Sequence, residues 1–312
     1  MSLRLRQRTT RARQPYIITM TKHSERKGKT AESVRTRKEF TDLTNHLKFE
    51  RTITMLHLSA GITAYILTIT FILGCALGSF ADCAASRLLS GESVLAGRSH
   101  CDRCGHVLGP LDLVPLVSWL VLKGRCRYCG AKVPAECPIT ELLSGIACVL
   151  IVCHFDVTAL SLEVILLWVI LLTLSLTDLH DWIIPDRLII LGTVLYLGSS
   201  ILFREPVSGI LRGVLFGIAL GGGLLLLSLI FDKITGKESL GGGDIKLFFM
   251  TGLYMTSAWE ILFYLILSCM FGLFFAAVRK TERLPFGPAI AAACMVMLLY
   301  GEPLTAWYTG LF

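Results

Sequence analysis

Residues 159–177 read A-L-S-L-E-V-I-L-L-W-V-I-L-L-T-L-S-L-T, an apolar run with a single charged residue, Glu163. A run of about 20 such residues can cross the hydrocarbon core of a bilayer as a helix. Further apolar runs lie at 58–83, 139–155, 188–203, 209–231, 245–257, 259–278 and 286–311. The composition agrees, because only 17% of the residues are charged, against about 25% in soluble domains. The sequence therefore predicts an all-α, polytopic membrane protein of about eight transmembrane helices.

The first 51 residues are polar and basic, with 14 of the chain's 30 Lys and Arg against five Asp and Glu. They contain no apolar stretch of the kind found in a signal peptide. We expect residues 1–54 to be a disordered extension, or to lie upstream of a true start at Met55. The segment lacks a folded motif for nucleic acid, so no nucleic-acid partner is expected.

Lys and Arg in the loops predict the orientation of the helices, because cytoplasmic loops carry an excess of these residues. With the loop 84–138 on the cytoplasmic side, that side holds 14 Lys and Arg, and the opposite side holds only Arg204 and Arg212. The basic N-terminal segment then lies outside, against the same rule, which is a second argument for a later start. The predicted organisation is a first transmembrane helix at 55–83, the cytoplasmic loop, and a seven-helix membrane core at 139–312.

Four cysteines in the long loop form two C-x-x-C pairs, C-D-R-C at 101–104 and C-R-Y-C at 126–129. Gly105 and Gly130 follow the pairs and suit the tight turn of a zinc knuckle. Two such pairs can hold one tetrahedral Zn²⁺ with the ligands Cys101, Cys104, Cys126 and Cys129. Disulfides and free thiols are the alternatives, and a cytoplasmic location argues against disulfides. Four protein ligands leave no open coordination position, so we expect a structural zinc in a small loop domain.

Aspartates gather at the ends of two predicted helices. L-T-D-L-H-D-W-I-I-P-D, residues 176–186, contains Asp178, and G-G-G-D, residues 241–244, ends in Asp244. The predicted orientation puts both on the cytoplasmic side, and ionisable groups at membrane depth are usually functional. Two facing carboxyls can share a proton, so that one activates a water against a peptide carbonyl while the other protonates the oxyanion. The chain has no H-E-x-x-H or G-x-S-x-G motif, so a hydrolase here would be aspartyl.

Neighbouring residues are candidates for binding substrate or shaping the loops: Gly241, Gly242, Gly243, Asp181, Asp186 and Lys246. The three glycines can adopt positive φ and leave bare backbone open to an extended chain. The alternative is a Gly-rich turn in which Asp244 caps the sixth helix. Asp186 could likewise only cap the fourth helix, and His180 could assist as a base or be an interfacial polar residue.

An ordered set of motifs resembles the type IV prepilin peptidases, which are bifunctional leader peptidases and N-methyltransferases. The similarity covers roughly residues 70–300. Its motifs are L-G-S-F at 77–80, S-H-C-D-R-C at 99–104, L-V-P-L-V-S-W-L at 113–120, K-G-R-C-R-Y-C at 123–129, P-I-T-E-L-L at 138–143 and the two aspartate stretches. The ordered set is specific to this family, whereas G-G-G-D alone is a weak signal.

The resemblance implies a GxGD-type intramembrane aspartyl protease of eight helices in the bacterial inner membrane, with its active site facing the cytoplasm. Asp178 and Asp244 match the family's catalytic aspartates. The implied substrates are prepilins and pseudopilins, which lose a short basic leader and are then methylated at the new N-terminal residue with S-adenosylmethionine. The cysteine loop, with its zinc, is associated with methylation. Recurrent family positions near it are Gly78, Ser79, Phe80 and Glu141.

The chain departs from the family pattern in three places. Asp82 stands where Asn is common, His180 where Asp is common, and Glu136-Cys137 where Arg-Tyr is usual. These positions lie nearer the methylation region, so the resemblance supports the peptidase more than the methyltransferase. The alternatives are a cation- or proton-coupled transporter that uses the aspartates and a non-enzymatic zinc-loop assembly factor. The clustering of the carboxylates at one face argues against a transporter, and a homo-oligomer is compatible with the sequence.

Overall fold

The structure is a computed structural model and describes residues 59–94, 97–203, 206–236, 240–279 and 285–311. The chain divides into two units, Met1–His57 and Leu58–Phe312, and the described residues belong to the second. The extension expected at 1–54 and the start expected at Met55 lie outside them. The described residues form helices and no strand, with two isolated β-bridges in the long loop. The all-α prediction is therefore confirmed.

The predicted apolar runs correspond to helices in the described part of the chain. They are α2 (Ala60–Ser90), α4 (Glu136–Phe155), α5 (Ala159–Asp181), α6 (Asp186–Leu202), α7 (Val207–Thr235), α8 (Gly242–Gly252), α9 (Ala258–Arg279) and α10 (Gly287–Thr309). Six of these helices are long and apolar enough to cross a membrane, and α6 and α8 are too short. A multi-pass membrane protein is therefore confirmed, while the count of eight spans stays a prediction.

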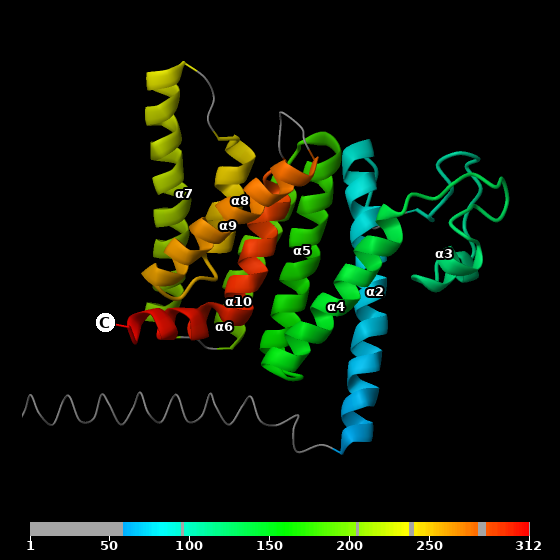
Figure 1. Cartoon of the computed structure of the whole chain (residues 1–312), viewed down its shortest axis with the longest axis horizontal. Coiled ribbons are helices and arrows are strands. Elements are labelled where there is room, and N and C mark those ends of the chain that lie inside the picture. Colours follow the sequence, from blue (N-terminus) through cyan, green and yellow to red (C-terminus); the bar gives the residue numbers. More distant parts are fainter. Residues whose placement is uncertain (1–58, 95–96, 204–205, 237–239, 280–284, 312) are drawn as a thin grey trace, which may run out of the picture. The chain divides into compact units, whose positions relative to one another are not determined.

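The helix α5 occupies the centre of the bundle and contacts α2, α4, α6 and α10 (Figure 1). Its inward side chains, including Leu167, Leu171 and Leu174, are fully buried. The paired helices α7 and α8, and α9 and α10, complete the bundle. Because α5 is surrounded on several sides, Asp178 in its last turn is buried.

Small residues let α2 and α4 pack with their backbones in close contact. A Cβ added at Gly74 would lie 2.9 Å from the Cα of Gly145, and one at Gly78 would lie 2.7 Å from the carbonyl oxygen of Thr140. Close approach through small residues is typical of helix pairs in membranes. This contact holds the two ends of the long loop side by side.

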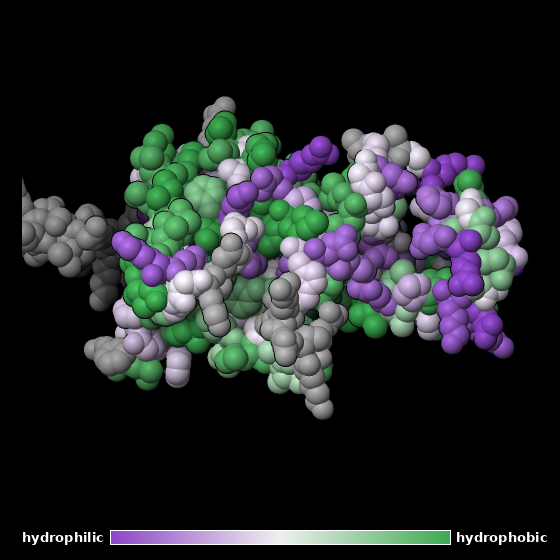
Figure 2. Space-filling view, turned by 90° about the horizontal axis from the view of Figure 1, so that it is seen from above, coloured by the Kyte–Doolittle hydropathy of each residue, from purple (hydrophilic) through white to green (hydrophobic). Residues whose placement is uncertain are grey.

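Apolar side chains cover the flank of the bundle. On α7, for example, Leu211, Leu215 and Ile218 are exposed, as expected for a surface that faces lipid. Figure 2 shows hydrophobic side chains in green around the bundle, and hydrophilic side chains in purple both over the long loop and across the end of the bundle that faces the viewer. That loop contains two short helices, η2 (Pro110–Asp112) and α3 (Val117–Val121).

Candidate active site

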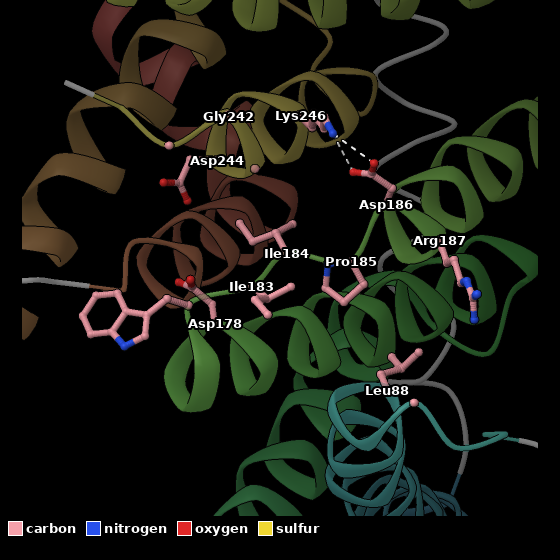
Figure 3. A pocket seen from close by; sticks show the side chains of 14 residues that line it. Leu88, Asp178, Ile183, Ile184, Pro185, Asp186, Arg187, Gly242, Asp244 and Lys246 are labelled. Carbon is pink, nitrogen blue, oxygen red and sulfur yellow. Dashed lines mark hydrogen bonds and ion pairs between the residues drawn. The ribbon is translucent and has the colours of Figure 1, made fainter. Parts of the chain in front are cut away.

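A cavity of about 770 Å³ lies at the end of the bundle where α5 ends and α6 and α8 begin. Asp178, the α5–α6 connection at 182–185 and the first two residues of α6 border one part of it (Figure 3). Residues 241–244 border another part, and Leu88 at the end of α2 a third. The fold therefore brings the two aspartate stretches of the sequence into one cavity.

Asp178 lies in the last turn of α5 and is 5% exposed. Its Oδ2 atom accepts a hydrogen bond of 2.8 Å from the backbone N–H of Gly287. Gly287 is the first residue of α10, and the N-terminus of a helix carries a partial positive charge. The start of α10 therefore orients this carboxyl group and stabilises it when it is ionised.

Asp244 is the third residue of α8 and comes from the opposite side of the cavity. Its Oδ1 atom is buried and has no hydrogen-bond partner among the described residues. Buried polar atoms are nearly always hydrogen-bonded, so an orphaned one points to a water or a ligand group. Asp244 is thus suited to hold a water or a substrate atom in the cavity.

The carboxyl groups of Asp178 and Asp244 face each other across the cavity (Figure 3). Two partly desolvated carboxylates at short range cannot both ionise without a large electrostatic penalty. The pair can therefore hold a single proton between them, which is the arrangement that aspartyl chemistry requires.

The glycines before Asp244 differ from the prediction of positive φ. Gly241 is the N-cap of α8 with φ −63° and ψ 136°, and Gly242 and Gly243 begin the helix; none of the three is among the residues with positive φ. The prediction is wrong because the helix starts earlier than expected and requires negative φ. Asp244 is likewise not the cap. The glycines provide space instead, since a Cβ at Gly243 would lie 3.0 Å from that of Ile184.

Asp186 and Lys246 form an ion pair at the rim of the cavity. The Nζ atom of Lys246 lies 2.7 Å from Oδ1 and 3.0 Å from Oδ2 of Asp186. Pro185 is the N-cap of α6, so Asp186 is not the cap and instead connects α6 to α8. Asp181, at the end of α5, is exposed and does not line the cavity.

Sequence reasoning missed several residues of the site, of which Gly287 and Trp182 have unusual backbone positions. A Cβ at Gly287 would lie 2.8 Å from Oδ2 of Asp178, so this position requires glycine; the signal in the sequence is P-F-G-P at 285–288. Trp182 lines the cavity with φ 59° and ψ 30°, a left-handed conformation that is costly for a bulky residue. The backbone N–H of Trp182 donates a hydrogen bond to the backbone carbonyl of Asp178. Backbone strain of this kind is often found at functional sites.

The four loop cysteines come together as the sequence predicts. The sulfur atoms of Cys101, Cys104, Cys126 and Cys129 all lie within 4.8 Å of one another, and those of Cys101 and Cys129 are 3.9 Å apart. Zinc–sulfur bonds of about 2.3 Å in a tetrahedron separate the sulfurs by about 3.8 Å, whereas a disulfide requires about 2.05 Å. The donor set therefore fits zinc.

Each cysteine pair closes with a glycine in the left-handed region, Gly105 at φ 67° and Gly130 at φ 70°. The N–H of Gly105 donates to the carbonyl of Cys101 at 2.8 Å, and the N–H of Gly130 donates to Cys126 at 2.9 Å. The glycines are needed here because other residues rarely adopt positive φ. Both knuckle turns predicted from the sequence are present.

The residues expected to serve methylation lie along the contact of α2 with α4. Glu141 is 8% exposed, and its Oε2 atom accepts a 2.7 Å hydrogen bond from the N–H of Leu116 in the loop. Gly78 packs against it, because a Cβ at Gly78 would lie 2.9 Å from the Cα of Glu141. Ser79 is half-buried, and Phe80 is exposed on the outer surface. The structure thus brings Gly78 and Glu141 together where the loop meets the bundle.

The three departures from the family pattern also meet. The Nε2 atom of His180 lies 3.2 Å from Oε2 of Glu136, and its Nδ1 lies 2.7 Å from the carbonyl oxygen of Leu176. The side chains of Asp82 and Cys137 are hydrogen-bonded. His180 does not line the cavity. Its place between α5 and α4 favours a role in packing over one as a base.

Comparison with known proteins identifies the family. The model of the N-terminal domain of bacterial peptidase A24 matches residues 72–155, and that of the type IV leader peptidase family matches residues 165–277. A prepilin leader peptidase/N-methyltransferase from Aeromonas salmonicida (strain A449) is 34% identical over 231 residues, which cover 69% of this chain and 76% of that protein. The chain belongs to the type IV leader peptidase family.

Two further relatives come from other organisms. A prepilin leader peptidase/N-methyltransferase from Bacillus subtilis (strain 168) is 30% identical over 250 residues, 78% of this chain and 98% of that protein. One from Pseudomonas aeruginosa is 35% identical over 220 residues, 67% of this chain and 74% of that protein. No solved structure matches the chain. The family resemblance noted from the motifs is confirmed.

Proposed function

We propose that this chain is a membrane aspartyl endopeptidase that removes the short leader of prepilins or pseudopilins and then methylates the new N-terminal residue. The observation that carries the proposal is the meeting of Asp178 and Asp244, from two different helices, in one cavity. The names of the relatives supply the substrate class and the second activity. The one-sided position of the aspartates gives the transporter alternative no support.

Cleavage follows from the facing carboxyl groups. A water between them loses a proton to the ionised carboxylate while its oxygen attacks the scissile carbonyl carbon, and the protonated carboxyl donates its proton to the carbonyl oxygen. The carbon–nitrogen bond then breaks, and the leaving amine takes a proton from the pair. Asp178 is fixed for this role by Gly287, and the free Oδ1 atom of Asp244 is suited to bind the water.

The rim near Gly242 suits an extended peptide. Gly241 has extended backbone, and a Cβ at Gly242 would meet no described atom within 4 Å. A substrate chain can therefore approach the backbone closely on this side. Across the cavity, Ile183 and Leu88 offer apolar contacts. We infer that the leader junction binds in an extended form between the two aspartates.

We assign a structural Zn²⁺ to Cys101, Cys104, Cys126 and Cys129, which would join the two knuckles through a closed four-thiolate site. S-adenosylmethionine would supply the methyl group in the second reaction. We expect the methylation site where the loop meets the bundle near Gly78 and Glu141. The departures at Asp82 and His180 lie close to this region.

The proposed location is the bacterial inner membrane, with the cavity on the cytoplasmic side. Six apolar helices support the membrane location. Arg87 and Lys233 lie in the last turns of α2 and α7, and these helices end on the side of the bundle where α8 begins (Figure 1). Basic residues at these ends agree with the positive-inside rule.

Purified protein in detergent, incubated with a prepilin, tests the proposal. We expect Asp178→Asn and Asp244→Asn each to lower the cleavage rate by about 10³-fold or more, because each removes one half of the acid–base pair. Both changes preserve side-chain volume, so thermal unfolding should show that the variants fold. Cleavage that survives either substitution would overturn the dyad assignment.

A further inference from the structure

The segment between the two cysteine pairs exposes an apolar surface. Its exposed side chains, which we name the α3 apolar face, are Leu111, Leu113, Val114, Val117, Leu120 and Val121. Leu111 is 73% exposed, Leu120 66% and Val121 70%. Surfaces that meet only water rarely gather so many large apolar side chains.

The α3 apolar face cannot turn inward, because the opposite side of the segment is fastened to the knuckles. The Nε1 atom of Trp119 donates to the carbonyl of Val133 at 3.4 Å, and its ring covers Gly124, where a Cβ would lie 2.9 Å from it. The carboxylate of Asp112 binds Nε of Arg127 at 2.7 Å. These contacts keep the α3 apolar face on the outside of the loop.

The start of α3 is tied to a helix that faces lipid. The N–H of Leu116 donates to Glu141, which lies in the second turn of the spanning helix α4. Beside Glu141 on α4, Leu142 and Leu143 are exposed and form part of the flank that meets the bilayer. The α3 apolar face thus begins next to an exposed apolar surface of a helix that is long and apolar enough to cross a membrane.

We propose that the α3 apolar face lies in the bilayer leaflet on the cavity side of the membrane and anchors the cysteine loop there. Continuity with the apolar side chains of α4 supports lipid as the occupant. The exposed basic residues Lys123 and Arg125 follow α3 directly, and cations beside an apolar surface suit anionic lipid headgroups. The proposal concerns the loop alone and does not depend on the proposed peptidase activity.

Photo-crosslinking of the full chain in nanodiscs of phosphatidylethanolamine and phosphatidylglycerol tests this anchoring. The photoreactive residue p-benzoylphenylalanine replaces Leu120 in one variant, Leu142 in a lipid-facing reference and Arg103 in a polar knuckle reference. After irradiation, intact mass gives the fraction that carries a lipid. We expect the fraction at Leu120 to match that at Leu142 within about twofold and to exceed that at Arg103 by about fivefold or more.

Two outcomes would overturn the anchoring. One is a lipid-adduct fraction at Leu120 no higher than at Arg103. The other is crosslinking of Leu120 to a second copy of the chain, or to added prepilin, in place of lipid. All three positions are on the surface, and bound zinc measured on each variant shows that the loop has folded.

Discussion

The Oδ2 atom of Asp178 and the backbone nitrogen of Gly287 are 2.8 Å apart, and the hydrogen bond between them joins the last turn of α5 to the first residue of α10. The carboxyl group lies at the C-terminal end of its own helix, which is electrostatically unfavourable for a negative charge. The N-terminus of α10 offsets this effect. The orientation of Asp178 thus depends on a residue that has no side chain.

Gly287→Ala should lower the cleavage rate without removing either aspartate. The new Cβ would lie 2.8 Å from Oδ2 of Asp178 and displace the carboxyl group. Because small misplacements of a catalytic group are costly, we expect kcat to fall by about tenfold or more, with a smaller change in KM. Gly222→Ala in α7 is the control, since a Cβ there meets no described atom within 4 Å. Equal rates for the two variants would show that this contact is unimportant.

Gly242 and Gly243 should respond differently to alanine. Both are helical, and alanine in a helix is favoured over glycine by up to about 1 kcal/mol. Gly242→Ala meets open space and should raise the melting temperature in detergent. At Gly243 the new Cβ would lie 3.0 Å from the Cβ of Ile184. Overpacking of this kind costs about 1–3 kcal/mol, so Gly243→Ala should lower the melting temperature. The same shift in both variants would contradict this packing.

Glu141→Ala should loosen the cysteine loop. The substitution leaves the N–H of Leu116 without its acceptor, at a cost of about 1–3 kcal/mol. Leu116 also has φ 60°, a conformation that needs support from its surroundings. We expect faster proteolysis within the loop and a lower melting temperature. Glu141→Gln retains a carbonyl acceptor and should restore most of the protection; if it behaves like alanine, the hydrogen bond is not the cause.

Cys101→Ser should abolish stoichiometric zinc binding. Loss of one of four thiolates opens a closed tetrahedral site and exposes the metal to chelators. Elemental analysis should give one zinc per chain in the wild type and much less in the variant. Cys269→Ser is the matched control, because Cys269 is exposed in α9 and outside the cluster. We expect cleavage to continue in both variants and methylation to fall only in Cys101→Ser.

The sequence predicts the helices well because a bilayer demands long apolar runs, and these are visible without knowledge of packing. The boundaries of α8 were harder to predict. The run suggests 245–257, whereas the helix spans Gly242–Gly252, since glycines that look like a loop begin it. After the C-terminal end of α8, the carboxylate of Glu260 accepts a hydrogen bond from the N–H of Thr256. This bond stabilises the turn between α8 and α9.

The sequence predicts only those residues of the site that have a chemically distinctive side chain. Asp178 and Asp244 stand at the edges of apolar runs, where a carboxylate is conspicuous. Gly287 is far from Asp178 in the chain and carries no chemical group that could indicate a partner. The tie between Leu116 and Glu141 depends on a backbone N–H and is equally invisible in the sequence. Contacts made by the backbone across long separations become clear only from the fold.

Gly74 and Gly78 press α2 directly against α4, so the two helices stay together without help from the segment that connects them. The packing of α2 on α4 therefore does not depend on the cysteine loop. We expect a chain in which a short turn joins Gly91 to Glu136 to keep the residues that line its cavity. Such an architecture allows the cysteine loop, and with it the methylation that we propose for it, to be gained or lost through a single insertion while the cavity remains intact.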